Sequence, residues 1–281
     1  MLLDGATGTE LERRGVPMVE GAWCGFANFT HPDIVRRVHE DYVRLGCDVI
    51  IANSFATTRH MLEAAGAGDR AAEACRLAVR PAKEAVARDR PVAVSGSLST
   101  AGPRVAPERE AANDREAAEA LADAGADLII LEWICDIERG KRAFEAARAT
   151  GLTIWVGLSV RRREDGKRTS FRYEEPSAAE LVRHWARAPV EALGIMHSSL
   201  SDTDLALPLV REAWAGPILV YPQQGWFEPP HWHFLELRPD DFADAAARWI
   251  EAGARIVGGC CGIGPEHIEA LARRVGRLSA S

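Results

Sequence analysis

The sequence predicts an α/β fold, a single (β/α)8 TIM barrel that spans residues 1–281 as one domain. Three observations support this prediction. Short apolar segments alternate with amphipathic, alanine-rich segments along the whole chain. Eight such strand–helix pairs fit into 281 residues, which is close to the usual size of this barrel. Gly46, Gly125 and Gly253 each end an expected helix directly before the next strand, where glycine adopts the left-handed conformation at low steric cost.

The expected strands are short and rich in β-branched residues or leucine, which suits parallel strands that are buried on both faces. We expect them at residues 1–4, 48–52, 91–95, 127–131, 153–158, 192–195, 217–221 and 255–257. Amphipathic helices are expected at residues 31–45, 69–88, 113–124, 137–149, 177–188, 202–214, 239–252 and 265–277. The proline- and aromatic-rich stretch 221–239 is interpreted as a long loop after the seventh strand.

Composition and charge argue against several classes of partner. The chain has 34 Lys and Arg against 41 Asp and Glu, a net charge of −7, so we expect neither nucleic acid nor an anionic membrane as partner. We expect no secretory signal, because the segment Met1-Leu2-Leu3-Asp4-Gly5 lacks a basic region and a long apolar segment. We expect no membrane span either, because no apolar run approaches about 18 residues. The 6 cysteines lack the spacing of a disulfide framework and fit reduced thiols, so we expect a cytoplasmic enzyme. The sequence leaves open whether the protein forms a homo-oligomer.

Two adjacent cysteines follow the last expected strand, in the segment Gly258-Gly259-Cys260-Cys261-Gly262. A disulfide between neighbouring cysteines strains the backbone. Two thiolates on one turn can instead bind the same soft metal ion, usually zinc. The alternative is a pair of buried, apolar cysteines. Because the carboxyl ends of barrel strands form the active-site face, this position favours metal binding by Cys260 and Cys261.

Other expected strands also end in polar residues. Asp4, followed by Gly5, can receive an ammonium group or cap a helical turn at residues 9–13. Asn53 can bind a polar ligand or close a turn. Glu132 follows an apolar run, so its carboxylate needs a partner, either a substrate amine or an internal arginine. His197 follows the sixth strand and is either a zinc ligand on the same rim as the cysteines or a satisfied loop or core residue.

The segment after the seventh strand combines amide and aromatic side chains. Tyr221 and Gln223 could line a pocket, and Trp226, Phe227 and Trp232 could form its wall. Tryptophan faces attract methyl-onium cations. Equally, these rings could pack the loop itself.

Together these residues resemble the homocysteine S-methyltransferase family, a barrel family. The matching segments run in order through nearly the whole chain: Asp4-Gly5-Ala6-Thr7-Gly8-Thr9-Glu10-Leu11, Trp23, His39-Glu40-Asp41-Tyr42, Gly46-Cys47-Asp48-Val49-Ile50-Ile51-Ala52-Asn53-Ser54-Phe55, Glu132, Tyr221-Pro222 and Gly258-Gly259-Cys260-Cys261-Gly262. The Gly-Gly-Cys-Cys-Gly segment is the most specific of them.

The resemblance implies a zinc ion held by three protein sulfurs, with one position left for the thiol of homocysteine. Zinc lowers the pKa of a bound thiol, and the resulting thiolate attacks a methyl group of an onium donor. Asp4 and Glu132 match family positions that hold the amino-acid part of the acceptor. The partners implied are therefore a small-molecule thiol acceptor and a methyl-onium donor.

The sequence departs from the family at its expected metal centre. Histidine stands at 197 where the family has a metal-binding cysteine, Met196 replaces an asparagine, and Gln223 replaces the asparagine after Tyr-Pro. Of three outcomes, we favour Zn²⁺ bound by His197, Cys260 and Cys261, since histidine can take over a zinc position. The others are recruitment of Cys24 or Cys135 as a replacement sulfur, and loss of zinc.

We therefore predict a zinc-dependent S-methyltransferase of methionine biosynthesis that moves a methyl group from S-methylmethionine, betaine or a similar donor to homocysteine or a related thiol. Two alternatives stay open. One is a family member with a changed thiol or selenol acceptor. The other is a non-catalytic barrel that binds a small amino acid or betaine.

Overall fold

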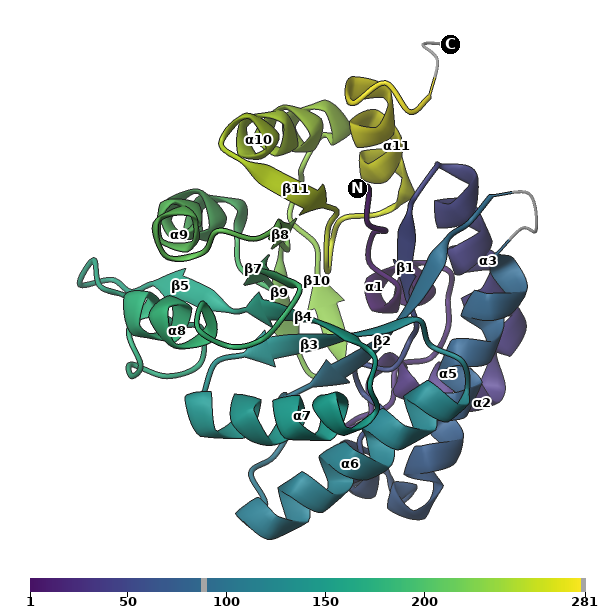
Figure 1. The fold of residues 1–281 in the computed structure, drawn as a ribbon. Helices are drawn as coiled ribbons and strands as arrows, with labels where there is room; N and C mark the ends of the chain where they lie inside the picture. The colour runs from purple at the N-terminus through teal and green to yellow at the C-terminus, as the bar shows by residue number, and fades with distance from the viewer. Residues whose placement is uncertain (87–89, 279–281) are drawn as a thin grey trace.

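The computed structural model describes residues 1–86 and 90–278. Within them, a curled sheet of 7 parallel strands in the order β1-β2-β3-β4-β7-β8-β11 forms the centre of the molecule (Figure 1). These strands are β1 (Val49–Ile51), β2 (Ala93–Ser99), β3 (Leu128–Ile134), β4 (Thr153–Leu158), β7 (Ala192–Met196), β8 (Ile218–Tyr221) and β11 (Ala254–Val257). All of them overlap expected strands, and the prediction of a curled, parallel α/β sheet is confirmed.

The N-terminal segment joins this sheet through single bridges rather than a strand. Leu2 pairs with Val257 of β11 and Leu3 pairs with Val49 of β1, both in parallel. The Leu3 N–H also donates to the Val257 carbonyl at 2.8 Å. The segment therefore lies between the two edge strands of the sheet (Figure 1), and the strand expected at residues 1–4 is reduced to two bridged residues.

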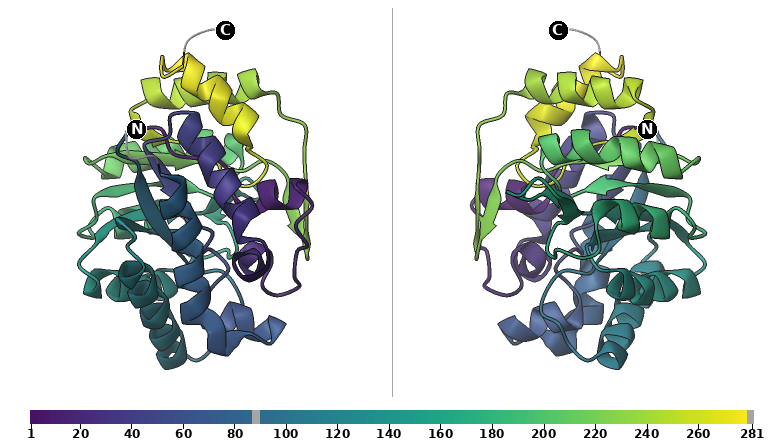
Figure 2. Two further views of the ribbon diagram at one scale, coloured as in Figure 1. Left: turned by 90° about the vertical axis from the view of Figure 1, so that its right-hand side faces the viewer. Right: turned by 90° about the vertical axis from the view of Figure 1, so that its left-hand side faces the viewer.

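Long helices cover the outer face of the sheet (Figures 1 and 2). They are α3 (Pro32–Arg44), α5 (Ala71–Ala85), α6 (Pro107–Asp123), α7 (Ile137–Ala149), α8 (Ala178–Trp185), α9 (Leu200–Ala213), α10 (Pro239–Glu251) and α11 (Pro265–Arg274). Helix α6 begins six residues before the expected 113, because Pro107 at its first turn and two acidic residues there favour a helix start. The expected helix end at residues 87 and 88 lies outside the described residues.

Shorter elements fill the connections. They are α1 (Gly8–Arg13), α2 (Ala27–Thr30), α4 (Arg59–Leu62) and 3-10 turns at Cys24–Phe26, Glu63–Ala65 and Gly68–Arg70. A hairpin of β5 (Val160–Arg162) and β6 (Arg168–Ser170) follows β4. Within the described part of the chain, no helix is long and apolar enough to cross a membrane.

The stretch 221–239 is not the plain loop that the sequence predicts. It contains an antiparallel hairpin of β9 (Trp226–Glu228) and β10 (His231–His233). The β-forming residues on both sides of Pro229-Pro230 pair with each other, and His231 Nδ1 lies 2.8 Å from Glu12 Oε1 of α1. The hairpin therefore lies beside the N-terminal helix (Figure 2).

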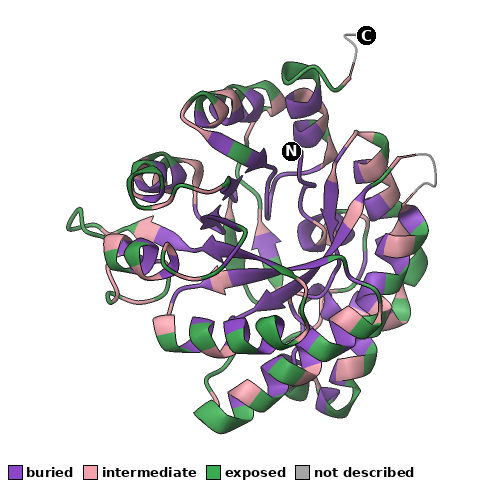
Figure 3. Ribbon diagram, in the orientation of Figure 1, coloured by how far each residue is buried: buried purple, intermediate pink, exposed green. Residues whose placement is uncertain are grey.

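Side chains of the sheet alternate between two buried clusters, as the period of two along a strand requires. The outer cluster, which includes Val94 and Leu98, packs against the helices, whose buried faces turn toward the sheet (Figure 3). The inner cluster fills the curl and includes Ile51, Ile130 and Leu219. Cys260 and Cys261 belong to the inner cluster, so the packed interior forms the floor beneath them.

Candidate metal and substrate site

The predicted polar residues gather at the carboxyl ends of the parallel strands. Glu132 lies near the end of β3, while His197 and the cysteine pair directly follow β7 and β11. Backbone hydrogen bonds continue past the strands and fix these loops to one another. The His197 N–H donates to the Tyr221 carbonyl at 3.2 Å, and the Cys260 N–H donates to the Pro222 carbonyl at 2.6 Å. The site is therefore held by main-chain contacts between neighbouring strand ends.

Four side chains form a continuous polar chain in this site. His197 Nε2 lies 2.7 Å from Glu132 Oε2, His197 Nδ1 lies 3.1 Å from Cys260 Sγ, and the two cysteine sulfurs are 3.7 Å apart. Since a carboxylate only accepts, Nε2 carries the proton of its bond to Glu132. Nδ1 is then the nitrogen that faces the thiols. The structure thus brings His197, Cys260 and Cys261 together, as the prediction of a shared rim requires.

Burial sets the electrostatics of these groups. Burial alone would lower the pKa of His197, but Cys260 and Glu132 outweigh it and raise this pKa to about 10. Burial also raises the pKa of Cys260 well above its usual value, with Cys261 adding to the effect and His197 opposing it. Burial therefore disfavours an uncompensated thiolate at Cys260.

The backbone around the site departs from regular geometry. His197 has a φ of 50° and Trp133, directly after Glu132, has a φ of 58°. A left-handed conformation in a non-glycine residue costs on the order of 1–3 kcal/mol and is typical of functional sites. Gly262 has a φ of 81°, and a Cβ there would lie 2.0 Å from the Gln224 carbonyl oxygen. The glycine after the cysteine pair is thus required by this turn.

The donor set fits a soft metal ion, although its present spacing is that of hydrogen bonds. Two sulfurs and one nitrogen around a tetrahedral zinc ion lie about 3.8 Å (S–S) and about 3.6 Å (S–N) apart. The sulfur–sulfur distance of 3.7 Å matches, whereas Cys260 Sγ and His197 Nδ1 are closer, at 3.1 Å. Among residues 1–86 and 90–278, no group of three or more His, Cys, Asp or Glu side chains is arranged to hold a metal ion as it stands. Binding therefore requires a shift of about half an ångström at His197.

The two candidate replacement sulfurs are occupied elsewhere. Cys24 Sγ donates to Asn53 Oδ1 at 3.2 Å, and Cys135 Sγ lies 3.9 Å from the Ser159 carbonyl. Burial raises the pKa of Cys135 to about 12, so the neutral thiol is strongly favoured. Neither contact favours recruitment of these residues to a metal.

Asp4 lies fully buried between backbone and phenol donors. Its Oδ2 accepts from the Ile51 N–H at 2.7 Å, and its Oδ1 accepts from the Tyr221 hydroxyl at 3.1 Å. The Tyr221 hydroxyl is also 3.0 Å from the Gly5 carbonyl oxygen. Burial raises the pKa of Asp4 well above its usual value, while Ile51 and Tyr221 oppose this shift. Asp4 does not cap α1, whose N-cap residue is Thr7 and which has no side-chain cap.

The remaining predicted substrate residues make their contacts with other partners than the polar chain. The Asn53 amide donates to the Cys24 carbonyl and to Asn28 Oδ1, both at 3.0 Å. Gln223 is buried, and its N–H donates to the Ser198 carbonyl at 2.8 Å. Trp226 is 48% exposed and stacks on His233 with ring centroids 4.9 Å apart.

Aromatic rings beside His197 form a wall that the predicted site residues do not include. The rings of Phe55 and Trp133 lie 5.1 and 5.5 Å from the imidazole. Trp23 packs on Phe55 at 6.4 Å and on Phe227 at 5.7 Å. Phe55 lies in the loop that follows β1, so its place just beyond a strand end could have identified it. Trp133 follows Glu132 on β3, where simple alternation would turn it away from the site.

Met196, for which the family resemblance predicts an asparagine, lies in the packed interior rather than in the polar chain. Its side chain belongs to the inner cluster, where a Cβ on Gly157 would lie 2.2 Å from its Sδ. The sulfur therefore occupies the space that Gly157 leaves.

Comparisons with known proteins agree with this geometry. The family model described as homocysteine S-methyltransferase matches residues 1–275. A homocysteine S-methyltransferase of Escherichia coli (strain K12) is 32% identical, with 98% of this chain and 94% of the relative covered. A selenocysteine Se-methyltransferase of Brassica oleracea var. italica is 25% identical over 98% of this chain and 88% of its own. The metallated form of the homocysteine methyltransferase MmuM from Escherichia coli superposes with a TM-score of 0.77 at 29% identity and covers 98% of this chain and 96% of that chain.

Proposed function

The chain belongs to the homocysteine S-methyltransferase family and is a methyltransferase; on this basis we propose that it moves a methyl group from an onium donor to a small thiol, with Zn²⁺ bound at His197, Cys260 and Cys261. The observation that carries the proposal is the convergence of these side chains at one rim, with sulfurs 3.7 Å apart and an imidazole nitrogen 3.1 Å from one of them. Homocysteine is the first acceptor to test, since the relatives named for it match nearly the whole chain.

In this proposal the protein supplies the ligands and the surroundings. When bound, the ion would stabilise the acceptor sulfur as a thiolate at neutral pH. His197 presents Nδ1 to the thiols because Glu132 holds the opposite nitrogen at 2.7 Å. The packed interior below the cysteines excludes water from the floor of the site. A thiolate in such a site keeps its charge for attack on a methyl group.

The aromatic wall supports an onium donor. The rings of Phe55 and Trp133 both pack on the imidazole of His197, and Trp23 packs on Phe55. Aromatic faces attract positively charged methyl groups of sulfonium and quaternary ammonium compounds. Asp4 and Tyr221, linked at 3.1 Å, offer a polar end for the amino-acid part of a substrate. We propose that the donor carries its methyl group along this wall toward the thiols.

A second candidate function is methyl transfer to a different thiol or to a selenol. The observation that favours it is the contact between Glu132 and His197, because one oxygen of the carboxylate expected to hold the acceptor amine is already engaged. The selenocysteine Se-methyltransferase relative supports a selenol within the same family.

Purified protein, loaded with one equivalent of Zn²⁺, would be incubated with homocysteine and with S-methylmethionine, glycine betaine and dimethylsulfonium donors in separate reactions. Methionine is measured by mass spectrometry, with a CD3-labelled donor to trace the methyl group. We expect labelled methionine with at least one donor. Product with selenocysteine but not with homocysteine would favour the second candidate, and no product with any pair would contradict both.

Two finer expectations belong to the same proposal. We infer that the Leu2–Leu3 bridges represent the first strand of an eight-unit barrel, which an experimental structure tests directly. All six cysteines lie among the described residues and are free thiols, which supports a cytoplasmic location. Cell fractionation tests that location.

A further inference from the structure

We propose that Glu132 is a positioning residue for His197 and that its carboxylate replaces the negative charge that a third thiolate would bring to the metal site. The inference rests on the proposed function in one respect, namely that a metal ion binds at His197, Cys260 and Cys261. It assigns to Glu132 a task different from holding the acceptor amine, the task that the sequence resemblance implies.

The contact between the two side chains is close and dry. Glu132 Oε2 and His197 Nε2 are 2.7 Å apart, and both side chains are 5% exposed. A charge-assisted hydrogen bond of this length in a buried site is among the stronger polar contacts in proteins. It fixes the proton on Nε2 and therefore leaves Nδ1 as the metal-facing nitrogen, which already lies 3.1 Å from Cys260 Sγ.

The backbone bends at both ends of this contact. The pairing of β3 with β4 shifts register between Leu131 and Ile134, and Trp133, within this bulge, has a φ of 58°. His197 itself has a φ of 50°. Strained conformations of this kind persist where the surroundings enforce them and cluster at functional sites. His197 thus lies at a strained position and Glu132 lies directly before one, which a simple surface ion pair does not require.

Charge explains why the pair belongs with the metal. Two thiolates and one neutral imidazole bring two negative charges to a divalent cation, one fewer than three thiolates. The Glu132 carboxylate, 2.7 Å from the imidazole, supplies the missing negative charge. It would be separated from the ion by the imidazole ring alone. Carboxylates hydrogen-bonded to a metal-binding histidine increase the basicity of the ligand and orient its ring. In this chain His197 and Glu132 therefore form one unit of the proposed metal site.

The test is a double-mutant cycle on metal binding. The variants are Glu132→Gln, His197→Cys and the double variant, each compared with the unmodified chain. Zn²⁺ affinity is measured by competition with a chromophoric chelator, and the visible spectrum of the Co²⁺ form reports the ligand field. We expect Glu132→Gln to weaken Zn²⁺ binding about 10–100-fold in the natural background and to shift the Co²⁺ bands. In the His197→Cys background, which restores a thiolate, we expect the same change to weaken binding less than about 3-fold.

The outcomes separate the two proposals. Equal losses in both backgrounds, or a loss below about 3-fold in the natural background, would overturn the role of Glu132 while leaving the metal site intact. If the unmodified chain binds no Zn²⁺ at all, both the proposed metal-dependent function and the role of Glu132 are wrong. If Glu132→Gln does not fold, Glu132→Asp replaces it in the test, because aspartate keeps the charge but retracts the carboxylate. We expect its Zn²⁺ affinity to lie between that of the unmodified chain and that expected for Glu132→Gln. Thermal unfolding of each variant checks that the fold is retained.

Discussion

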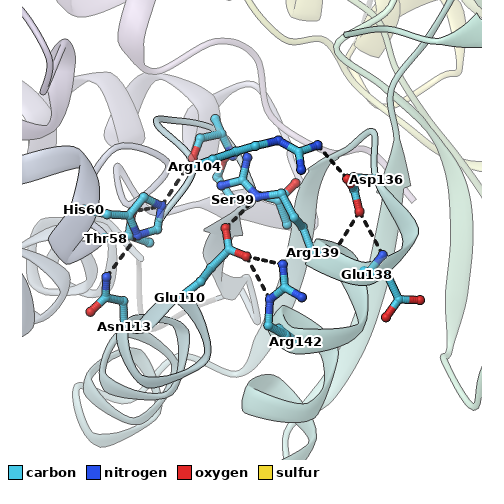
Figure 4. Close-up of polar contacts among 12 residues, drawn as sticks. Thr58, His60, Ser99, Arg104, Glu110, Asn113, Asp136, Glu138, Arg139 and Arg142 are labelled. Atoms are coloured by element: carbon cyan, nitrogen blue, oxygen red, sulfur yellow. Dashed lines mark hydrogen bonds and ion pairs between the residues drawn. The ribbon is translucent and has the colours of Figure 1, made fainter. Parts of the chain in front are cut away.

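Two of the buried clusters of charged and polar side chains among the described residues differ in what surrounds their charges. In the site, Glu132 is bonded to His197, which in turn contacts the Cys260 thiol. His197 and Trp133, the residue after Glu132, have left-handed backbone conformations. Between α6 and α7, Glu110 accepts from Arg139 Nε at 2.5 Å and from Arg142 Nε at 2.8 Å (Figure 4). This second cluster joins regular helices through hard, complementary charges.

The difference separates a structural cluster from a chemical one. The Glu110 carboxylate is matched by two guanidinium groups that cannot lose their protons, so these two cations keep their charge at any physiological pH. The site instead holds groups that exchange protons or bind soft metals, Cys260 and His197, next to a single carboxylate. Changes in the first cluster should therefore alter stability, and changes in the second should alter metal binding and catalysis.

The largest effect is expected in the site, for Cys260→Ala. Because the variant loses a thiolate ligand, Zn²⁺ should no longer bind tightly and kcat/KM should fall at least about 10⁴-fold, a loss of more than about 5 kcal/mol of transition-state stabilisation. The matched control is Cys75→Ala, which removes a buried thiol bonded to Thr57 at 3.2 Å, far along the chain from the site. Metal analysis and steady-state kinetics measure both. If Cys260→Ala still binds one zinc ion per chain, Cys260 is not an essential metal ligand and the chemical role given to this cluster is wrong.

The structural cluster should respond to Glu110→Gln through stability alone. Removal of the charge leaves two guanidinium groups without their common partner in a buried setting, where breaking such a pair costs about 3–5 kcal/mol. Urea unfolding measures the free energy of unfolding, and kinetics at saturating metal should stay within about 2-fold of the unmodified chain. The control is Glu138→Gln, since the Glu138 side chain is 69% exposed beside Lys141 and should change stability by less than about 0.5 kcal/mol. A large loss of activity for Glu110→Gln in protein that is still folded would show that this cluster also affects catalysis, against the separation proposed here.

Asp114 is a buried carboxyl group of α6 near the Glu110 cluster, and it should make the stability of the protein depend on pH. Burial and the nearby Glu110 raise its pKa from 3.8 to about 7, against the opposing effect of Arg139 and Arg142. Since the folded state binds this proton more tightly than the unfolded state, the carboxyl contributes stability at low pH that is lost as pH rises from about 4 to about 7. Asp114→Asn should therefore stabilise the protein by up to about 4 kcal/mol at pH 8 and by progressively less toward pH 4. Urea unfolding across this range checks the slope, and a gain that does not change with pH would rule out titration of Asp114.

Much of the fold follows from patterns that are local in sequence. The expected strand at residues 153–158 and the expected helix at 137–149 coincide with β4 and α7, because regular apolar periodicity sets both. The hairpin of β9 and β10 and the reduced first strand were not predicted. Strands of three residues, such as Trp226–Glu228, are too short to show a period, and pairing with distant residues determines whether they form.

The candidate site divides in the same way. The rule that strands of a parallel barrel present their carboxyl ends on one face is enough to predict that His197 and the cysteine pair lie together. The contact of Glu132 with His197 was not predicted. It depends on the bulge at Trp133 and on the φ of 50° at His197, and such local departures from regular backbone leave no periodic signal in the sequence. The role of each predicted substrate residue stays a prediction.

The smallest effect is expected at the edge of the site, for Trp226→Ala. Its ring is 48% exposed and lies parallel to His233 at an interplanar angle of 8°, whereas its neighbour Phe227 packs on Trp23 of the aromatic wall at 5.7 Å. We therefore expect Trp226→Ala to change kcat/KM for the donor less than about 3-fold, or about 0.7 kcal/mol, and Phe227→Ala to raise the donor KM more. Donor kinetics at saturating thiol measure both variants. A different result would be a loss of kcat/KM of more than about 10-fold for Trp226→Ala but not for Phe227→Ala. In that case the hairpin closes over the donor with the Trp226 ring inward, and Trp226 rather than Phe227 belongs to the donor site.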